Sequence, residues 1–370
     1  MPRPSLSTGR IRLPDVPGVL TASQARATGL AIAAMQEPSG QIPWFPGGHT
    51  DPWDHVESAM GLTVAGLADE AEAAYLWLRA TQRADGSWPM QWRGGTVENP
   101  DTDTNFCAYP AVGVWHHLLV TGRRAFAERM WPMVRRAIDM ALEMQAPAGE
   151  FYWARGADGQ PVREALLTGN SSIHLSLHCA LQLARELDAP QPAWEVALGR
   201  LRHALRRHPE AFSPKPEFSM DWYYPVLGGA VRGRSAQELL DRRWRDFVVD
   251  GLGIRCVDHQ PWVTGAETCE LSLALTAIGD TRRARELLAA MQHLRDPDGA
   301  YWTGLVFTDG KRWPVEKSSW TSAVMLLAAD ALSGATAGSA LFTDAGVAIE
   351  GHADRDVDCR VPCYAGSVPG

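Results

Sequence analysis

Residues 43–55 read PWFPGGHTDPWDH and place two carboxylates, two histidines and three aromatic side chains in a loop that leads into a helix. Thr50 or Asp51 can cap this helix, Pro52 suits its first position, and Asp54 follows in the first turn, where the helix dipole favours a negative charge. Acids in a first turn are ordinary capping residues. A functional role for this segment is favoured because the same loop-to-helix design recurs along the chain.

A repeated pattern joins the end of one helix to the start of the next. Four times a helix end leads through a glycine turn to an aromatic residue, at Gln36–Trp44, Gln82–Trp88, Gln145–Trp153 and Gln292–Trp302. After these turns, and at two further places, a new apolar helix starts from a polar cap, at residues 51–54, 101–105, 169–172, 220–222, 264–267 and 318–320. The starts are about 45 to 70 residues apart, which is room for a pair of helices in each repeat.

The helical segments fall into two kinds. Segments that are apolar almost all round are expected to be buried helices, at 60–67, 112–120, 173–183, 271–278 and 322–332, with a sixth starting near 220. Segments with one charged face alternate with them, at 21–35, 70–82, 124–144, 192–208, 236–249 and 281–293. This alternation predicts an all-α (α/α)6 toroid of six inner and six outer helices, with short hairpin-like strands near 151–153 and 301–307.

The toroid is expected to be one catalytic domain that spans residues 21–335. Residues 1–20 precede it as an N-terminal extension, and residues 336–370 change to Gly, Ala and Thr and then to an Asp-rich segment, which predicts an irregular tail packed on the barrel. The six cysteines form no paired set, so free thiols are expected. Cys359 and Cys363 in the tail are the one place where a disulfide or a metal is conceivable.

Composition excludes several classes of partner. The chain has 370 residues, of which 45% are hydrophobic and 21% charged, so it can bury a large core. Its net charge of -8 leaves no basic patch for nucleic acid. Residues 1–18 lack the apolar core of a signal peptide, and no run reaches the ~20 apolar residues of a membrane span. We therefore expect a soluble cytoplasmic protein that contacts neither nucleic acid nor membrane.

The inner helices of such a toroid run in the same direction, so their polar starts gather on one face. There the free amides and positive dipole ends surround a funnel. The acids expected on this face are Asp51, Asp54, Asp101, Asp103, Asp221 and Glu267, with Glu270 one turn deeper. The chain also has fifteen tryptophans against seven tyrosines, many of them beside Gly or Pro, and flat amphipathic rings suit a groove. Besides Asp103 and Asp221, the substrate contacts expected there are Trp44, His49, Trp53, His55, Trp88, Trp92, Trp222, Tyr223, Trp262, Trp302 and Trp320.

These helix pairs and Trp-rich glycine turns resemble those of the (α/α)6 glycoside hydrolases. The whole chain, with its segment 44–55 and Thr264-Gly265-Ala266-Glu267, is similar to the actinobacterial hydrolases of methylmannose polysaccharides. The resemblance implies cleavage of internal α-1,4 bonds in a partly methylated mannose chain, without a cofactor or a metal. It also implies that Asp51, Asp54 and Glu267 occupy the acidic positions of the active site.

Two other classes compete with this interpretation. Residues 82–88, QRADGSW, fit the Q-x3-G-x-W turn of prenyltransferases and triterpene cyclases, and Asp101-Thr102-Asp103-Thr104 is close to the D-x-D-D motif that protonates a polyene. The last Asp of that motif is Thr here, and no zinc-ligand set accompanies it. A non-catalytic carbohydrate-binding toroid is the third class, but binding alone gains little from several buried carboxylates.

Ring geometry gives an expectation for the acid pair. The helices that start at Asp51 and Glu267 are next-but-one neighbours, so axes ~9 Å apart place them roughly 16 Å apart and leave on the order of 8 Å between their side chains. That gap holds a water and falls in the ~6.5 to 9.5 Å range of inverting glycosidases. Glu267, in apolar surroundings, is expected to be the general acid and Asp51 or Asp54 the base, although the roles can be exchanged.

Overall fold

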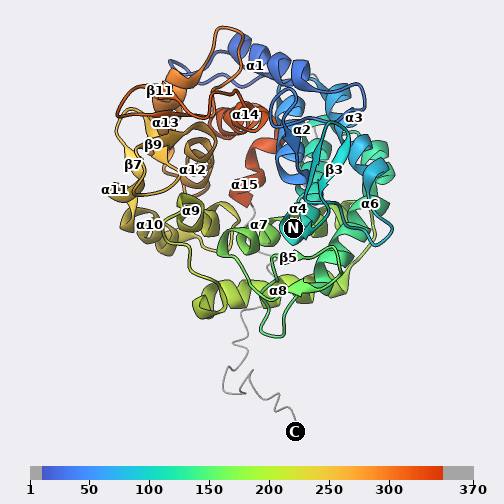
Figure 1. The fold of residues 1–370 in the computed structure, drawn as a ribbon. Coiled ribbons are helices and arrows are strands. Elements are labelled where there is room, and N and C mark those ends of the chain that lie inside the picture. Colours follow the sequence, from blue (N-terminus) through green and yellow to red (C-terminus); the bar gives the residue numbers. More distant parts are fainter. Residues whose placement is uncertain (1–10, 345–370) are drawn as a thin grey trace.

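The computed structural model describes residues 11–344, and most of them lie in helices arranged as two concentric rings (Figure 1). The inner ring consists of α2 (Pro52–Val64), α5 (Pro110–Thr121), α7 (Leu167–Glu186), α9 (Ser219–Leu227), α12 (Gly265–Ala277) and α14 (Ser319–Ser333). Each inner helix contacts the next, and α14 contacts α2 and closes the ring. The outer ring consists of α1 (Ala22–Met35), α3 (Ala68–Thr81), α6 (Arg124–Glu143), α8 (Pro192–Arg207), α10 (Gly233–Arg242) and α13 (Thr281–Ala290). The predicted (α/α)6 toroid is confirmed.

Two predicted helices are interrupted. The outer helix expected over 236–249 ends at Arg242, and α11 (Trp244–Phe247) and β7 (Val248–Val249) follow it. The second inner helix is preceded by a short helix, α4 (Thr104–Ala108), and starts again at Pro110. A proline cannot donate the backbone hydrogen bond that would carry one helix smoothly into the next.

Short strands connect the helices on one face of the toroid. The first sheet has the order β1 (His49–Thr50), β2 (Gln91–Arg93), β3 (Thr96–Asn99), and the second the order β4 (Thr102–Asp103), β5 (Ala154–Arg155), β6 (Pro161–Val162). The third joins β11 (Lys311–Arg312), β10 (Gly304–Val306), β9 (Trp262–Thr264), β8 (Gly253–Arg255) and β7. All pairings within these sheets are antiparallel. Strands β5 and β10 lie near the two predicted hairpins.

The repeated Gln-to-Gly turns clamp the outer helices α1, α3 and α6 to the next outer helix. The Gln82 side chain donates to the Gly86 carbonyl (3.0 Å) and to the Met133 carbonyl of α6 (3.0 Å). Gly86 has a φ of +90°, and a Cβ there would lie 2.3 Å from the Arg136 carbonyl oxygen, so only glycine fits. Gln36 and Gly40 make the same contacts with α3, and Gln145 and Gly149 with α8, while Gly299 packs on Ala27 of α1. The turn is therefore an element of the scaffold.

The starts of the inner helices lie together, as the toroid requires. The Ser319 amide of α14 donates to the Trp44 carbonyl (2.8 Å), just before α2. The Thr168 hydroxyl of α7 donates to Asp221 of α9 (2.6 Å). The loops with the glycines and tryptophans therefore surround one end of the barrel.

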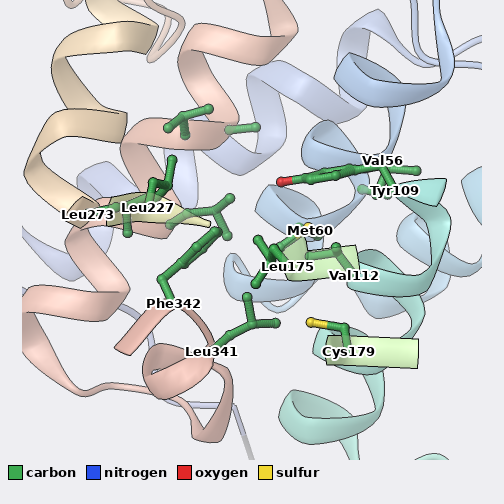
Figure 2. Close-up of a cluster of buried hydrophobic side chains, with 14 of the residues drawn as sticks. Val56, Met60, Tyr109, Val112, Leu175, Cys179, Leu227, Leu273, Leu341 and Phe342 are labelled. Carbon is green, nitrogen blue, oxygen red and sulfur yellow. The ribbon is translucent and has the colours of Figure 1, made fainter. Parts of the chain in front are cut away.

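Apolar side chains fill the barrel below that end. Figure 2 shows Leu341 and Phe342 of α15 (Leu341–Asp344) reaching the buried side chains of the inner helices, among them Met60 and Leu273. The backbone carbonyl of Phe342 accepts a hydrogen bond from Arg232 (2.7 Å). The start of the predicted tail thus packs against the barrel, whereas its residues 345–370, with Cys359 and Cys363, lie outside the described residues.

Two further expectations concern helices and thiols. Among residues 11–344, no single helix is long and apolar enough to cross a membrane, although α14 and residues Ala337–Thr343 together meet that test as a bent pair. The four cysteines in this part of the chain, Cys107, Cys179, Cys256 and Cys269, are free thiols.

Candidate active site

The first turn of α2 carries two of the predicted catalytic acids. Asp51 caps the helix, and its Oδ1 accepts the Asp54 amide (2.9 Å). His49 approaches the other oxygen of Asp51 from β1, with Nε2 at 3.9 Å. His49, Asp51 and Asp54 each offer a polar atom, and these atoms all lie within 4.8 Å of one another. That spacing suits either a shared proton or a bridging cation.

The protonation of the pair follows from its surroundings. Burial first, and then the negative charge of Asp51, raise the pKa of Asp54 well above its usual value. Asp51 accepts the Asp54 amide at the positive end of the helix dipole. Asp54 is therefore the acid of this pair whose surroundings favour the protonated form.

Glu57 lies one turn deeper on α2, in a cradle of aromatic donors. It accepts hydrogen bonds from the Tyr109 hydroxyl (2.5 Å) and from the indole N–H groups of Trp320 (2.5 Å) and Trp53 (3.2 Å). Burial raises the pKa of Glu57 to about 7 in spite of these three donors. This carboxyl group thus fixes two tryptophans beside the acid pair.

Helix α12 supplies a matching pair of acids. Glu267 lies in its first turn, and Glu270 one turn deeper accepts the hydroxyl groups of Tyr223 and Tyr224. Burial, and then the charge of Glu57 on the facing helix, raise the pKa of Glu270 well above its usual range. Because α14 contacts both α2 and α12, these two helices flank one inner helix, which was the premise of the expected gap between the acids.

Asp103 extends the cluster toward α4. It caps that helix by accepting the Phe106 amide (3.0 Å), and burial raises its pKa to about 7. The charge of Asp51 contributes to this shift. Carboxyl groups from α2, α4 and α12 therefore interact across one low-dielectric space, and several of them stay protonated near neutral pH.

Some of the predicted aromatic contacts surround these acids. Trp44 stacks on His49 and packs against Trp320, with ring centroids 5.5 Å apart in both pairs. Trp53 touches Tyr109 and Tyr224. Trp262 and Trp302 are half-buried on the β9–β10 side and donate to the Trp313 carbonyl (2.7 Å) and to Asp296 (3.2 Å).

Other predicted contacts lie in the barrel wall instead. Trp88 has no exposed surface and donates to the Leu78 carbonyl (2.9 Å). Trp222 stacks on Phe247 and donates to the Leu239 carbonyl (3.0 Å), and Trp92 packs edge-on against Trp77.

The predicted contacts other than tryptophan are also held by hydrogen bonds. Both ring nitrogens of the buried His55 bond to backbone groups, those of Ile42 and Ala74. The Tyr223 hydroxyl donates a hydrogen bond to Glu270, and Asp221 accepts one from the Thr168 hydroxyl at the start of α7. Their hydrogen-bonding groups serve the scaffold.

The residues that sequence reasoning left out of the site are the deeper ones. Glu57, Tyr109 and Tyr224 were missed because they lie at or near the starts of inner helices, outside the polar caps from which the site acids were chosen. A signal was present, since Glu57 follows Asp54 by three residues and Glu270 follows Glu267 by three. That spacing places each pair on one helix face.

Comparison with known proteins agrees with this architecture. A solved wild-type glycosidase matches with a TM-score of 0.65 at 16% identity, over 85% of this chain and 96% of its own. A D-mannose isomerase matches with a TM-score of 0.65 at 12% identity, over 83% of this chain and 95% of its own. These likenesses show the fold. No protein-family model matches the chain.

A helical barrel with facing carboxyl groups at one end of its inner helices is the architecture of an (α/α)6 glycoside hydrolase, and this chain is one. This chain is 62% identical over 347 residues to the MMP endo-(1,4)-3-O-methyl-alpha-D-mannosidase of Mycolicibacterium hassiacum. The match covers 94% of this chain and 96% of that enzyme. The chain belongs to the family of that mannosidase. This membership decides against the cyclase and prenyltransferase alternative.

Proposed function

We propose that the enzyme cleaves internal 1,4 bonds in a polysaccharide of α-linked mannose units that carry 3-O-methyl groups. The family relative is an endo-acting 3-O-methyl-α-mannosidase, and 62% identity over nearly the whole of both chains supports the same substrate class here. The observation that carries the reaction type is the set of buried acids on α2 and α12, among which burial and the neighbouring Asp51 raise the pKa of Asp54 well above its usual value.

The protonation pattern favours one assignment of roles. Asp54, whose raised pKa favours the protonated form, is proposed to donate a proton to the leaving glycosidic oxygen as that bond breaks. Glu267 is proposed to take a proton from the water that attacks the anomeric carbon, and Asp51 keeps Asp54 protonated. These roles reverse those expected from the sequence. A water between acids on next-but-one helices gives inversion.

Substitution of the two acids tests the reaction type. Asp54→Asn and Glu267→Gln should each lower kcat by about 10²- to 10⁴-fold with the fold intact, because each removes a proton-transfer group. Glu98→Gln is the matched control, since Glu98 is an exposed acid on β3 that pairs with Arg93. Proton NMR of the first product should show the inverted anomer. Near-native turnover by both variants, or a retained anomer, would contradict the proposal.

Leaving-group dependence separates the two roles. An aryl glycoside of a methylated mannose oligosaccharide needs little help from a general acid, because its phenolate leaves readily. Asp54→Asn should therefore regain most of its activity on this substrate, whereas Glu267→Gln should not. The opposite result would restore the assignment expected from the sequence.

A further inference from the structure

A cavity of about 110 Å³ lies beside the acids, between the starts of α2, α4 and α7. Its apolar wall includes Trp53, Leu166 and Ile173, and its polar lining includes Asp103, Asn105 and Trp153. Trp53 also donates to Glu57, and Asp103 interacts with Asp51. Two residues of the cavity wall therefore interact directly with the acid cluster.

Two polar atoms of this cavity lack hydrogen-bond partners within residues 11–344: the side-chain carbonyl oxygen of Asn105, which is 5% exposed, and the buried indole N–H of Trp153. Other polar residues of the same wall are satisfied. The Thr168 hydroxyl donates to Asp221 (2.6 Å), and the Asn170 side chain exchanges two hydrogen bonds with the Phe151 backbone. A buried polar atom without a partner carries the cost of its lost hydration. A ligand that pairs with these two atoms recovers that cost.

We infer that this cavity recognises an O-methyl group together with the edge of the sugar ring that carries it. An ether oxygen only accepts hydrogen bonds, so it matches the donor-only indole of Trp153. A neighbouring sugar hydroxyl can donate to the carbonyl oxygen of Asn105. The methyl group needs apolar contact, and Leu166 and Ile173 provide it.

The size of the cavity agrees with this occupant. A cavity of about 150 Å³ holds one benzene molecule, so the smaller volume here admits a methoxy group and a ring edge rather than a whole sugar. The inference rests on the proposed function, because it assigns the methyl groups of that substrate to a place in the site. It adds the residues that distinguish a methylated unit from a plain mannose.

Gly169 allows this cavity to be filled without strain. It lines the cavity in the first turn of α7, and a Cβ there would meet only Asn105 Cβ, at 3.8 Å. Gly169→Val should therefore occupy the methyl position and leave the fold intact. Gly199→Val is the matched control, because Gly199 is an exposed helical glycine of α8 with no atom within 4 Å of its added Cβ.

Two measurements are made on both variants and on the wild type. The first is the affinity for methyl 3-O-methyl-α-D-mannoside and for methyl α-D-mannoside. The second is kcat/KM for a 3-O-methylated α-1,4-mannose oligosaccharide and for its unmethylated counterpart of equal length. Wild type and Gly199→Val should favour the methylated compound by about 10- to 200-fold, the discrimination that one carbon in an apolar pocket provides. Gly169→Val should lose this preference, because its rate on the methylated chain falls more than its rate on the unmethylated chain.

The outcomes separate the cavity from the reaction. If the oligosaccharides are cleaved but Gly169→Val keeps the preference, or lowers both rates equally, the inference is overturned while the proposed function stands. If neither oligosaccharide is cleaved but the methylated glycoside still binds better and Gly169→Val abolishes this, the proposed function fails and the cavity assignment stands. No preference by wild type in binding or cleavage overturns the inference.

Discussion

Replacing Glu57 by Gln should change how the stability of the enzyme depends on pH. Glu57 is 2% exposed and accepts hydrogen bonds from Tyr109, Trp320 and Trp53. Burial raises its pKa from 4.5 to about 7. The folded protein therefore keeps this proton over a range of pH in which the unfolded chain has already lost it.

The size and sign of the effect follow from this shift. A raised carboxyl pKa stabilises the folded state fully below pH 4.5, and the stabilisation is lost as pH rises to about 7. The shift corresponds to about 3 kcal/mol in the free energy of unfolding. Gln cannot ionise in either state, so its variant lacks this decline. It carries instead a pH-independent penalty of about 1–3 kcal/mol, because its amide N–H groups face other donors.

Urea unfolding between pH 4 and pH 8 measures the prediction. The stability advantage of wild type over Glu57→Gln should shrink by about 3 kcal/mol from the acid to the alkaline end. Glu128→Gln is a suitable control, because Glu128 is exposed on α6 and pairs only with Arg124, so its profile should parallel that of wild type. An advantage that stays constant with pH, or grows with it, would refute the reasoning.

Three further predictions concern metal, the lower core and the tryptophans. Chelation by EDTA should leave hydrolysis unchanged, because the proposed acid Asp54 acts with its own proton; lost activity that Ca²⁺ or Zn²⁺ restores would contradict this. Phe342→Ala should lower the free energy of unfolding by about 3–5 kcal/mol, measured in urea, with activity per folded molecule kept. Trp44→Ala should raise KM with little change in Tm, whereas Trp88→Phe should lower Tm with KM unchanged; the reverse pattern would show that their roles are exchanged.

The ring of helices was predictable because the residues that define its repeat also make local backbone contacts. Gln82 and Gly86 mark a helix end and a turn with a positive φ, and the same residues dock onto the next outer helix. Local and tertiary requirements therefore select the same residues. The interrupted helix after Arg242 had no such agreement, because its continuation as α11 and β7 is set by pairing with β8.

The roles of the tryptophans were less predictable. A tryptophan follows each of the four glycine turns, but its ring can turn toward the barrel wall or toward the funnel. The Trp88 ring turns toward the barrel wall because the Leu78 carbonyl accepts its indole N–H. Trp44 lies beside His49 because Glu316, far away in sequence, accepts its N–H (2.5 Å). A partner such as Glu316 comes from a distant segment, which no local pattern reveals.

Helix-cap chemistry identifies the acids at the helix starts and gives less information about the acids one turn deeper. Asp51, Asp54 and Glu267 stand at helix starts, where local chemistry singles them out, whereas Glu57 and Glu270 are buried a turn deeper and are held by aromatic donors from other inner helices. The deeper pair costs desolvation energy. In return Glu57 holds the rings of Trp53 and Trp320, and Glu270 holds those of Tyr223 and Tyr224. The upper acids can then differ in charge within a rigid frame. A glycosidase needs that difference, one carboxyl group protonated and the other ionised at the same pH.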